Sequence, residues 1–502
     1  MNVFGDLLYG FGIALQPWNL LACFFGVFVG TLVGVLPGIG PVGAMSLLLP
    51  MTFGISPVTG IIMLSGIYYG SMYGGSTTSI LVNIPGEAAS VVTCLDGHQM
   101  ALKGRAGPAL GISAFGSFIA GTFGLVGLMF FANIVSGVAL LFGPAEYFSL
   151  MCLGLSLVTY LTQGSVLRGL IMAALGLFLS LIGQDVVTGR ARFTFGLTGF
   201  IDGVGLVPVV MGLFGVSEVF MGLEKLHEQR KVLKTRFKDL FPTREDWRRS
   251  AAPIGRGTLI GFLLGILPGG GAIISSFISY GTEKRLSKRP EEFGKGAIEG
   301  VAGPESANNA ASSSGFIPLF SLGIPANVIM ALLLGALMIH GVRPGPLLMT
   351  EHPEVFWGTV ASMYVGNIML LILNLPLIGM WVQVLKVPYR KLFPLILLFC
   401  LIGVWSIGTN IFDLYVMLLF GIMGYILRKL EYEPAPLVLA FVLGPMLEKN
   451  LRQALILSDG NLSVFFTRPL SAACLIVCFL LLLTAIIPAV RKKRSEVVVE
   501  ED

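Results

Sequence analysis

Two runs of small polar residues interrupt long apolar stretches of this chain, at residues 68–79 and 303–315. Their hydroxyl and amide oxygens, together with unwound backbone carbonyls, suit a hard cation such as Na⁺. Backbone N–H groups and helix N-termini instead suit the oxygens of a carboxylate. We therefore predict an ion or anion site here, with the backbone unwound. The candidate substrate ligands are Gly74, Gly75, Ser76, Thr77, Thr78, Ser79, Asn83, Asn308, Asn309, Ser312, Ser313 and Ser314.

The same runs have a purely structural interpretation, because small and polar residues also pack transmembrane helices against each other. For any single serine or glycine, this interpretation explains the residue as well as a binding role does. The occurrence of two such runs at corresponding places in the chain favours a binding site.

Each polar run is preceded by the sequence Leu-Pro-Gly, at residues 36–38 and 267–269. Proline removes a backbone donor and clashes with the preceding turn, whereas glycine adopts conformations closed to other residues. We predict that the chain reverses or unwinds at both places, with a re-entrant hairpin in the second; a kinked helix is the alternative. The candidate cation ligands at these breaks are Pro37, Gly38, Gly40, Pro268, Gly269 and Gly271.

The polar runs carry no positive charge, since no Lys or Arg occurs within residues 68–86 or 300–326. An anionic substrate would be held there by neutral donors, with its charge offset by a co-bound cation, for which we expect Na⁺ and keep H⁺ as the alternative. Glu87 follows the first run, and Glu305 lies near the start of the second. Acids at membrane depth are functional candidates, but we favour hairpin caps in water for both and leave them out of the predicted site.

The elements that position these residues are membrane helices. Of the 502 residues, 55% are hydrophobic and only 12% are charged, whereas soluble domains carry roughly 25% charged residues. Apolar runs near the length needed to cross a bilayer recur along the chain, for example at 18–36, 109–131 and 355–381. We predict an all-α protein that crosses the membrane many times, with roughly 10–14 membrane segments, re-entrant hairpins and broken helices.

Basic residues set the predicted orientation. The polar stretch 224–250 contains nine Lys or Arg residues, and the tail opens with four basic residues at 491–494. By the positive-inside rule both lie in the cytoplasm, and we expect the N-terminus in the periplasm. We divide the chain into a first transmembrane repeat (1–223), a basic cytoplasmic linker (224–250), a second transmembrane repeat (251–465), a final transmembrane helix (466–490) and a cytoplasmic tail (491–502).

The two halves resemble each other. GTLVGVLPGIG at 30–40 reappears as GFLLGILPGGG at 261–271, an offset of 231. NIPG at 83–86 corresponds to GIPA at 323–326, an offset of 240, and GPAL at 107–110 to GPLL at 345–348, an offset of 238. Secondary transporters are often built from such repeats, with the site at the interface between them. Because the linker and the tail are predicted on the same side, the second repeat and the final helix together cross the membrane an even number of times. The second repeat alone then crosses an odd number of times, and we predict that the two repeats are inverted.

Other classes of function fit less well. The sequence contains no HExxH or GxSxG motif, and its four histidines are scattered, so we do not expect an enzyme. We expect no cofactor other than a coupling ion, and no nucleic-acid partner, because the basic stretches adjoin membrane spans. A channel or a stand-alone transporter for another small solute remains the alternative.

The two-fold motif pattern resembles the TctA family, the large membrane subunit of tripartite tricarboxylate transporters. The resemblance rests on residues 30–40, 68–86 and 303–326, and extends over nearly the whole chain with its basic middle linker. It implies a multi-pass protein of the bacterial inner membrane that imports tricarboxylates such as citrate, or dicarboxylates, by symport with Na⁺ or H⁺. It also implies two partners, a small membrane subunit of the TctB type and a periplasmic solute-binding protein of the TctC type.

Overall fold

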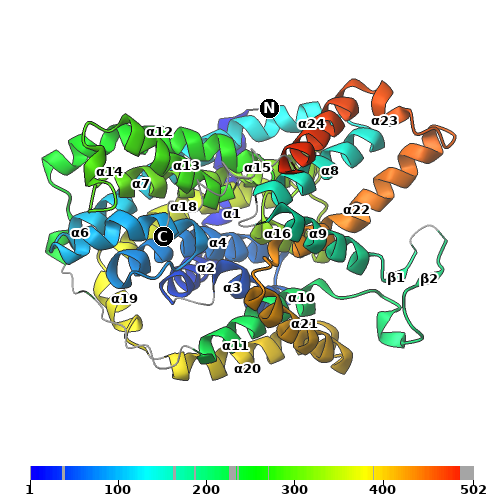
Figure 1. The fold of residues 1–502 in the computed structure, drawn as a ribbon, viewed down its shortest axis with the longest axis horizontal. Helices are drawn as coiled ribbons and strands as arrows, with labels where there is room; N and C mark the ends of the chain where they lie inside the picture. Colours follow the sequence, from blue (N-terminus) through cyan, green and yellow to red (C-terminus); the bar gives the residue numbers. More distant parts are fainter. Residues whose placement is uncertain are drawn as a thin grey trace.

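The computed structural model describes residues 2–36, 40–161, 165–185, 188–224, 233, 237–269, 271–387 and 389–486. The predicted cation ligands Pro37 and Gly38, much of the predicted linker and the whole predicted tail lie outside these ranges. Within them the chain is almost entirely helical (Figure 1). This confirms the prediction of an all-α multi-pass membrane protein.

The elements before the linker are α1 (Val3–Ala14), α2 (Pro17–Val35), α3 (Gly40–Leu48), η1 (Leu49–Thr52), α4 (Pro57–Val82), η2 (Ala88–Ser90), α5 (Val91–Thr93), η3 (Cys94–His98), α6 (Gln99–Leu102), α7 (Ala106–Ala139), α8 (Pro144–Leu161), α9 (Val166–Ser180), β1 (Gly183–Gln184), β2 (Ala191–Arg192), η4 (Thr198–Phe200), α10 (Leu206–Val210), η5 (Met211–Val216) and α11 (Ser217–Glu224). The short strands β1 and β2 pair antiparallel.

The elements that follow are η6 (Phe237–Leu240), α12 (Arg244–Ile266), α13 (Gly271–Leu286), η7 (Pro290–Glu292), α14 (Glu299–Ser314), α15 (Phe316–Leu322), α16 (Val328–Ile339), α17 (Leu348–Glu351), α18 (Pro353–Asn374), α19 (Ile378–Val384), α20 (Tyr389–Gly408), α21 (Ile411–Lys429), α22 (Ala435–Leu457), α23 (Val464–Thr467) and α24 (Pro469–Ile486). Among the described residues, five helical stretches are long and apolar enough to cross a membrane, and further apolar helices are shorter. The number of membrane segments stays a prediction.

Two helix pairs pack through glycines at corresponding positions. In the first pair, α2 approaches α4 so closely that a Cβ atom on Gly30 would lie 2.5 Å from the carbonyl oxygen of Ile67. In the second, a Cβ on Gly261 of α12 would lie 2.1 Å from the carbonyl oxygen of Ala307 on α14. The two contacts are related by the offsets of the sequence repeat, 231 between the glycines and 240 between their partners. Glycine is required at both places because no side chain fits between the backbones.

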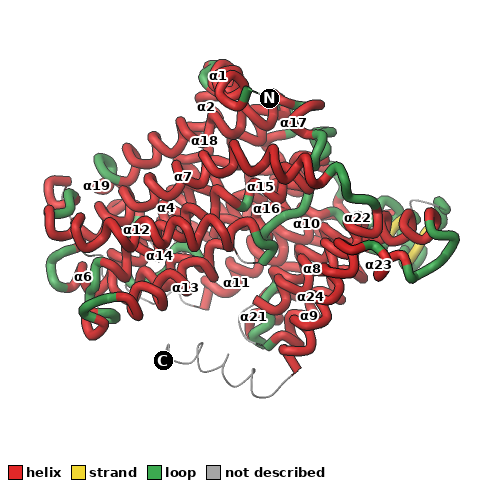
Figure 2. The backbone as a smooth tube through the Cα atoms, turned by 90° about the horizontal axis from the view of Figure 1, so that it is seen from above, coloured by secondary structure: helices red, strands yellow, loops and turns green. Residues whose placement is uncertain are grey.

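The helices α4 and α14, one from each half, run antiparallel past each other. Ser76 on α4 contacts Glu305 on α14, and the ring of Tyr68, earlier on α4, lies 6.2 Å from that of Phe316, just after α14. Figures 1 and 2 show both helices inside the bundle. Inverted repeats predict this opposite orientation, although common descent of the halves stays a prediction.

The breaks lie close to where the sequence predicts them. The helices α12 and α13 pack against each other across a turn in which Gly269 has a φ of 81°. Its N–H group donates a 2.8 Å hydrogen bond to the carbonyl oxygen of Ala326. The helices α4 and α15 end in left-handed residues at equivalent positions, Asn83 with a φ of 59° and Gly323 with a φ of 70°.

The prediction that the polar runs are unwound is wrong, because residues 57–82 and 299–314 are continuous helices. Serine hydroxyls in them donate to the carbonyl oxygen four residues earlier, as Ser79 does to Gly75 and Ser312 does to Asn308. Such bonds satisfy a hydroxyl inside a helix. The backbone is therefore not free to bind ions along these runs, and any ligand must be held by side chains.

Candidate functional site

A buried carboxylate lies where α4 and α14 cross. Glu305 of α14 is 1% exposed and accepts a 2.5 Å hydrogen bond from the hydroxyl of Ser76 on α4. The hydroxyl of Thr93 on α5 donates to its other oxygen. Ser113 on α7 is a third hydroxyl partner, so the described donors to this carboxyl group are neutral and come from the first half.

A second buried carboxylate lies in the loop after α4. Glu87 is 8% exposed, and its side chain caps η2 by accepting a 2.6 Å hydrogen bond from the N–H of Ala89. Its other oxygen accepts a 3.1 Å hydrogen bond from the amide of Asn308 on α14. A Cβ on Gly75 would lie 2.8 Å from the Glu87 side chain, so glycine is what makes room for the acid beside α4. We call Ser76, Glu87, Thr93, Glu305 and Asn308 the central polar cluster.

The expectation that Glu87 and Glu305 cap hairpins in water is wrong. Glu87 does cap a short helix, but both acids are buried between the two halves. Glu87 follows the first polar run and Glu305 lies in the second, and the antiparallel crossing of α4 and α14 brings these parts of the chain together.

Acids near the linker, unlike the two buried ones, form ion pairs with an arginine. Arg249, at the start of α12, donates hydrogen bonds of 2.5 Å to Glu292 and 2.7 Å to Glu299. The hydrogen bond from Arg249 lowers the pKa of the Glu292 carboxyl, which stays ionised beside its partner. Among the described residues, no Lys or Arg forms an ion pair with Glu87 or Glu305. The two deep acids are therefore uncompensated.

The remaining predicted substrate ligands lie on several sides of the cluster. Asn309 donates a 2.7 Å hydrogen bond to Ser117 on α7, and the hydroxyl oxygen of Ser79 lies 3.0 Å from that of Ser90. Thr78 instead donates to the carbonyl oxygen of Val35 at the end of α2.

Others serve packing. Gly74 lies against α2, Ser313 against Gly124 of α7, and Ser314 against Gly265 of α12. Thr77 is buried. Asn83 is exposed at the end of α4 and is not brought to the cluster, because its left-handed backbone turns the chain away from the helix axis.

The described break residues lie at helix starts or in the turn between α12 and α13. Gly271 begins α13, whose next residue, Ala272, packs with Ala89 and Ala311. The N–H of Gly269 is used by Ala326, and Pro268 lies beside Gly154 of α8. The other described break residue, Gly40, begins α3.

Several polar residues near the cluster were not predicted. The hydroxyl of Tyr68 accepts a 3.0 Å hydrogen bond from Asn327, and that of Tyr73 donates a 2.7 Å hydrogen bond to Asn367 on α18. Both tyrosines belong to the first polar run, which was the available signal. Their asparagine partners lie far away in the sequence and only the fold identifies them.

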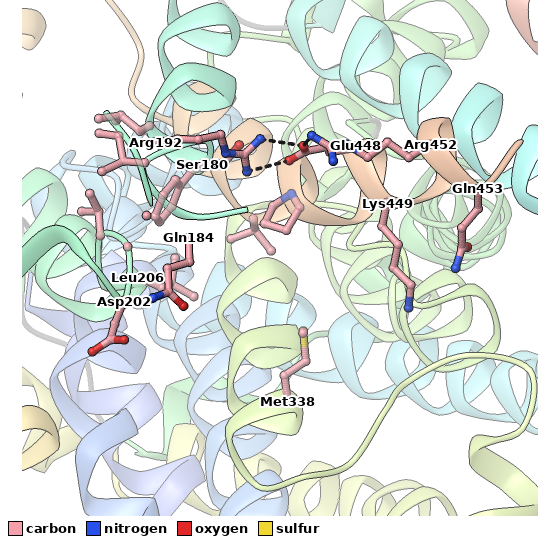
Figure 3. A pocket seen from close by; sticks show the side chains of 18 of the residues that line it. Ser180, Gln184, Arg192, Asp202, Leu206, Met338, Glu448, Lys449, Arg452 and Gln453 are labelled. Carbon is pink, nitrogen blue, oxygen red and sulfur yellow. Dashed lines mark hydrogen bonds and ion pairs between the residues drawn. The ribbon is translucent and has the colours of Figure 1, made fainter. Parts of the chain in front are cut away.

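A pocket of about 540 Å³ (Figure 3) is lined in part by residues of β1 and β2, which lie at one end of the molecule in Figure 1. Leu206, at the start of α10, lines it, whereas α11 ends where the linker begins. The pocket therefore faces away from the linker. Met338, near the end of α16, also lines it, and the residue that caps the start of α16 is Asn327, the partner of Tyr68. A helix of 12 residues, about 18 Å long, thus separates the pocket from the seam between the halves.

Two arginines of this pocket form ion pairs with acids, whereas its lysine, Lys449, forms none with a described residue. Arg192 and Arg452 each contact both Glu448 and Asp185, at 2.6–3.3 Å. Lys449 lines the same pocket, and none of the described residues forms an ion pair with it. The one other acid of the pocket, Asp202, lies on a different side in Figure 3.

The described residues contain no group of three His, Cys, Asp or Glu side chains that could hold a metal ion. Carboxylate, amide and hydroxyl oxygens are the groups that the central polar cluster offers. They suit a small hard cation and hydrogen-bonding anions rather than a transition metal.

Comparison with known proteins gives a consistent assignment. The sequence matches the family described as "Tripartite tricarboxylate transporter TctA family" over residues 20–439. It is 52% identical, over the full length of both chains, to an Agrobacterium vitis protein described as an "Uncharacterized 52.8 kDa protein in TAR-I ttuC' 3'region". It is also 55% identical over 242 residues, 48% of this chain and all of the relative, to an "Uncharacterized protein in TAR-II ttuC' 3'region" of the same organism. No solved structure matches.

Proposed function

Because the chain belongs to the TctA family of tripartite tricarboxylate transporters, we propose that it is the large membrane subunit of a binding-protein-dependent importer of small carboxylates. Its place is the bacterial inner membrane, and it works by alternating access driven by a cation gradient, with Na⁺ as the expected ion and H⁺ as the alternative. A small membrane subunit of the TctB type and a periplasmic solute-binding protein of the TctC type complete the system.

The observation that carries this proposal is the buried seam between α4 and α14. It joins hydroxyl and amide side chains from both halves, contains two acids and has no basic residue within residues 68–86 or 300–326. Side chains such as Asn309 and Ser312, which here donate to Ser117 and to a backbone carbonyl, hold the carboxylate oxygens by exchanging these bonds, and a cation balances the charge. Sites of this kind at the interface of two oppositely oriented halves are typical of secondary transporters.

Substrate reaches the seam from the periplasmic side. The pocket near Lys449 supports this route, because it faces away from the basic linker, which we expect in the cytoplasm. The unpaired ammonium group of Lys449 attracts a carboxylate released by the binding protein. From there α16 leads to Asn327 and Tyr68.

The proposal is tested with the three proteins in proteoliposomes. Counterflow exchange of a panel of radiolabelled di- and tricarboxylates is measured with equal NaCl on both sides. We expect saturable exchange of at least one carboxylate, competed by its unlabelled form. If the complete system exchanges no carboxylate, or conducts without saturation, the proposal is wrong and the channel alternative gains.

A further inference from the structure

The charge of Glu87 is not required by the fold. Its side chain caps η2 through the N–H of Ala89. At an offset of 240 in the second half, Asn327 caps α16 by accepting a 2.9 Å hydrogen bond from the N–H of Met330. An asparagine is as good a helix cap as an acid. The second half therefore performs with a neutral side chain what the first half performs with a carboxylate.

The partners of these two caps are also equivalent. Asn308 donates to Glu87, and Asn327 donates to Tyr68, while residues 68 and 308 are again related by an offset of 240. Each cap thus reaches the polar helix of the opposite half. Of the two symmetry-related contacts, only the one at Glu87 contains an acid.

Glu305, like Glu87, is an acid whose counterpart in the other half is a neutral residue. The residue at the equivalent position of α4 is Ser65, which is fully buried. A small neutral side chain is therefore compatible with this place in the packing. An acid at membrane depth is costly and usually marks a functional site, so the two extra carboxyl groups call for a ligand.

Asn308 supplies a separate observation. Its side chain is 1% exposed, and its Nδ2 atom donates to Glu87, which fixes the orientation of the amide. The Oδ1 atom of the same amide is buried and has no hydrogen-bond partner among the described residues. Leaving a buried acceptor unpaired costs about 1–3 kcal/mol. This oxygen belongs to the amide that contacts the Glu87 carboxyl, and it accepts no hydrogen bond from the described residues, as expected of an oxygen that is free to bind a cation.

Resting on the proposed function, we propose that Glu87, Glu305 and the amide oxygen of Asn308 bind the coupling ion, Na⁺, within the central polar cluster. The three groups are oxygen ligands from both halves, and the ion offsets carboxylate charge that no Lys or Arg offsets. Asn309 and Ser312 follow directly on α14, so the ion lies beside the donors for the substrate carboxylate. Binding of the cation and the anion then stabilise each other.

Binding of Na⁺ is tested without transport. The complex of this chain with its small membrane subunit is purified in detergent, and its Tm is measured in NaCl and in choline chloride at equal ionic strength. A ligand that binds only the folded state raises Tm in a concentration-dependent way. We expect NaCl, but not choline chloride, to raise Tm of the wild type. Glu87→Gln and Glu305→Gln should shift the NaCl dependence at least tenfold to higher concentration.

The control is Glu291→Gln, in the exposed charged loop before α14, which should behave like the wild type. Glu87→Asn serves as a second variant, because it places the residue of the other half in the cap and should keep the fold. Equal effects of NaCl and choline chloride on the wild type would overturn the inference, as would variants with the wild-type NaCl dependence. In either case, persistent carboxylate exchange in the counterflow assay would leave the proposed function standing; absence of exchange alone would remove the proposed function instead.

Discussion

The Nδ2 atom of Asn308 donates a 3.1 Å hydrogen bond to Oε1 of Glu87, joining two positions that are distant in the sequence. One residue belongs to the polar helix of the second half, and the other to the loop that ends the polar helix of the first. The contact places an acid against an amide in a region without basic residues. Through it, the loop after the first polar run contacts the second polar run.

Glycine at position 75 makes room for Glu87. A Cβ atom added by Gly75→Ala would lie 2.8 Å from the Glu87 side chain, so the acid must shift. We expect transport to fall at least tenfold at matched membrane expression. Gly255→Ala on α12 is the control, since a Cβ there meets nothing within 4 Å. It should leave uptake unchanged and stabilise the helix by about 0.5–1 kcal/mol. Normal uptake by Gly75→Ala would show that the position of Glu87 does not matter.

Two hydroxyls on α4 should differ in their importance. Ser76 donates to the buried Glu305 carboxyl, whereas Thr78 donates to a backbone carbonyl of α2. Loss of a hydrogen bond to a charged group costs about 1.5–3 kcal/mol, against about 0.5–1.5 kcal/mol for a neutral one. Ser76→Ala should therefore lower kcat/KM for uptake roughly ten- to a hundredfold, and Thr78→Val should chiefly lower Tm. Equal uptake defects in the two variants would mean that both hydroxyls only pack helices.

Lys449 should act on affinity rather than on turnover. Lys449→Gln removes the unpaired cation of the pocket, and we expect KM for the carboxylate to rise with little change in kcat. The separate variant Lys449→Arg keeps the positive charge and should therefore have a KM close to that of the wild type. Lys288→Gln, in the exposed loop between α13 and η7, is the control for loss of one lysine. The proposed route is wrong if Lys449→Gln has the wild-type KM.

The predicted orientation is tested with two exposed loop residues on opposite ends of the molecule. Lys288 lies in the loop between α13 and η7, and Asn461 lies between α22 and α23. We expect a membrane-impermeant thiol reagent applied from the periplasm to label Asn461→Cys and to spare Lys288→Cys. The reverse pattern would contradict a cytoplasmic linker and, with it, the periplasmic position of the pocket.

The class of protein and the positions of its breaks follow from the sequence because they depend on local chemistry. Apolar runs interrupted by Pro and Gly predict broken membrane helices, and the turn at Gly269 lies at one of the predicted breaks. The state of the polar runs does not follow from local chemistry. Glycine and serine are poor helix formers in water, but the runs are helical here because Gly30 and Gly261 admit a neighbouring helix and serines bond to their own backbone.

The most informative parts of the site could not be predicted for a related reason. Glu87 and Glu305 lie at the edges of polar segments, where exposure to water is the ordinary outcome. Their burial results from contacts with Asn308 and Ser76, each of which belongs to the opposite half of the chain. A sequence without the fold contains no signal for these pairings. Asn83 illustrates the opposite error, since a polar residue beside the run is turned to the surface by its own backbone.

The most direct test of the central claim is uptake by proteoliposomes that contain this chain and its small membrane subunit, with the solute-binding protein and a labelled carboxylate outside. Accumulation is compared with and without the binding protein, and with and without inward Na⁺ and pH gradients. We predict accumulation above the external concentration only when the binding protein and a cation gradient are both present, with Na⁺ as the effective ion. Accumulation that needs neither the binding protein nor any cation gradient would contradict the proposed function.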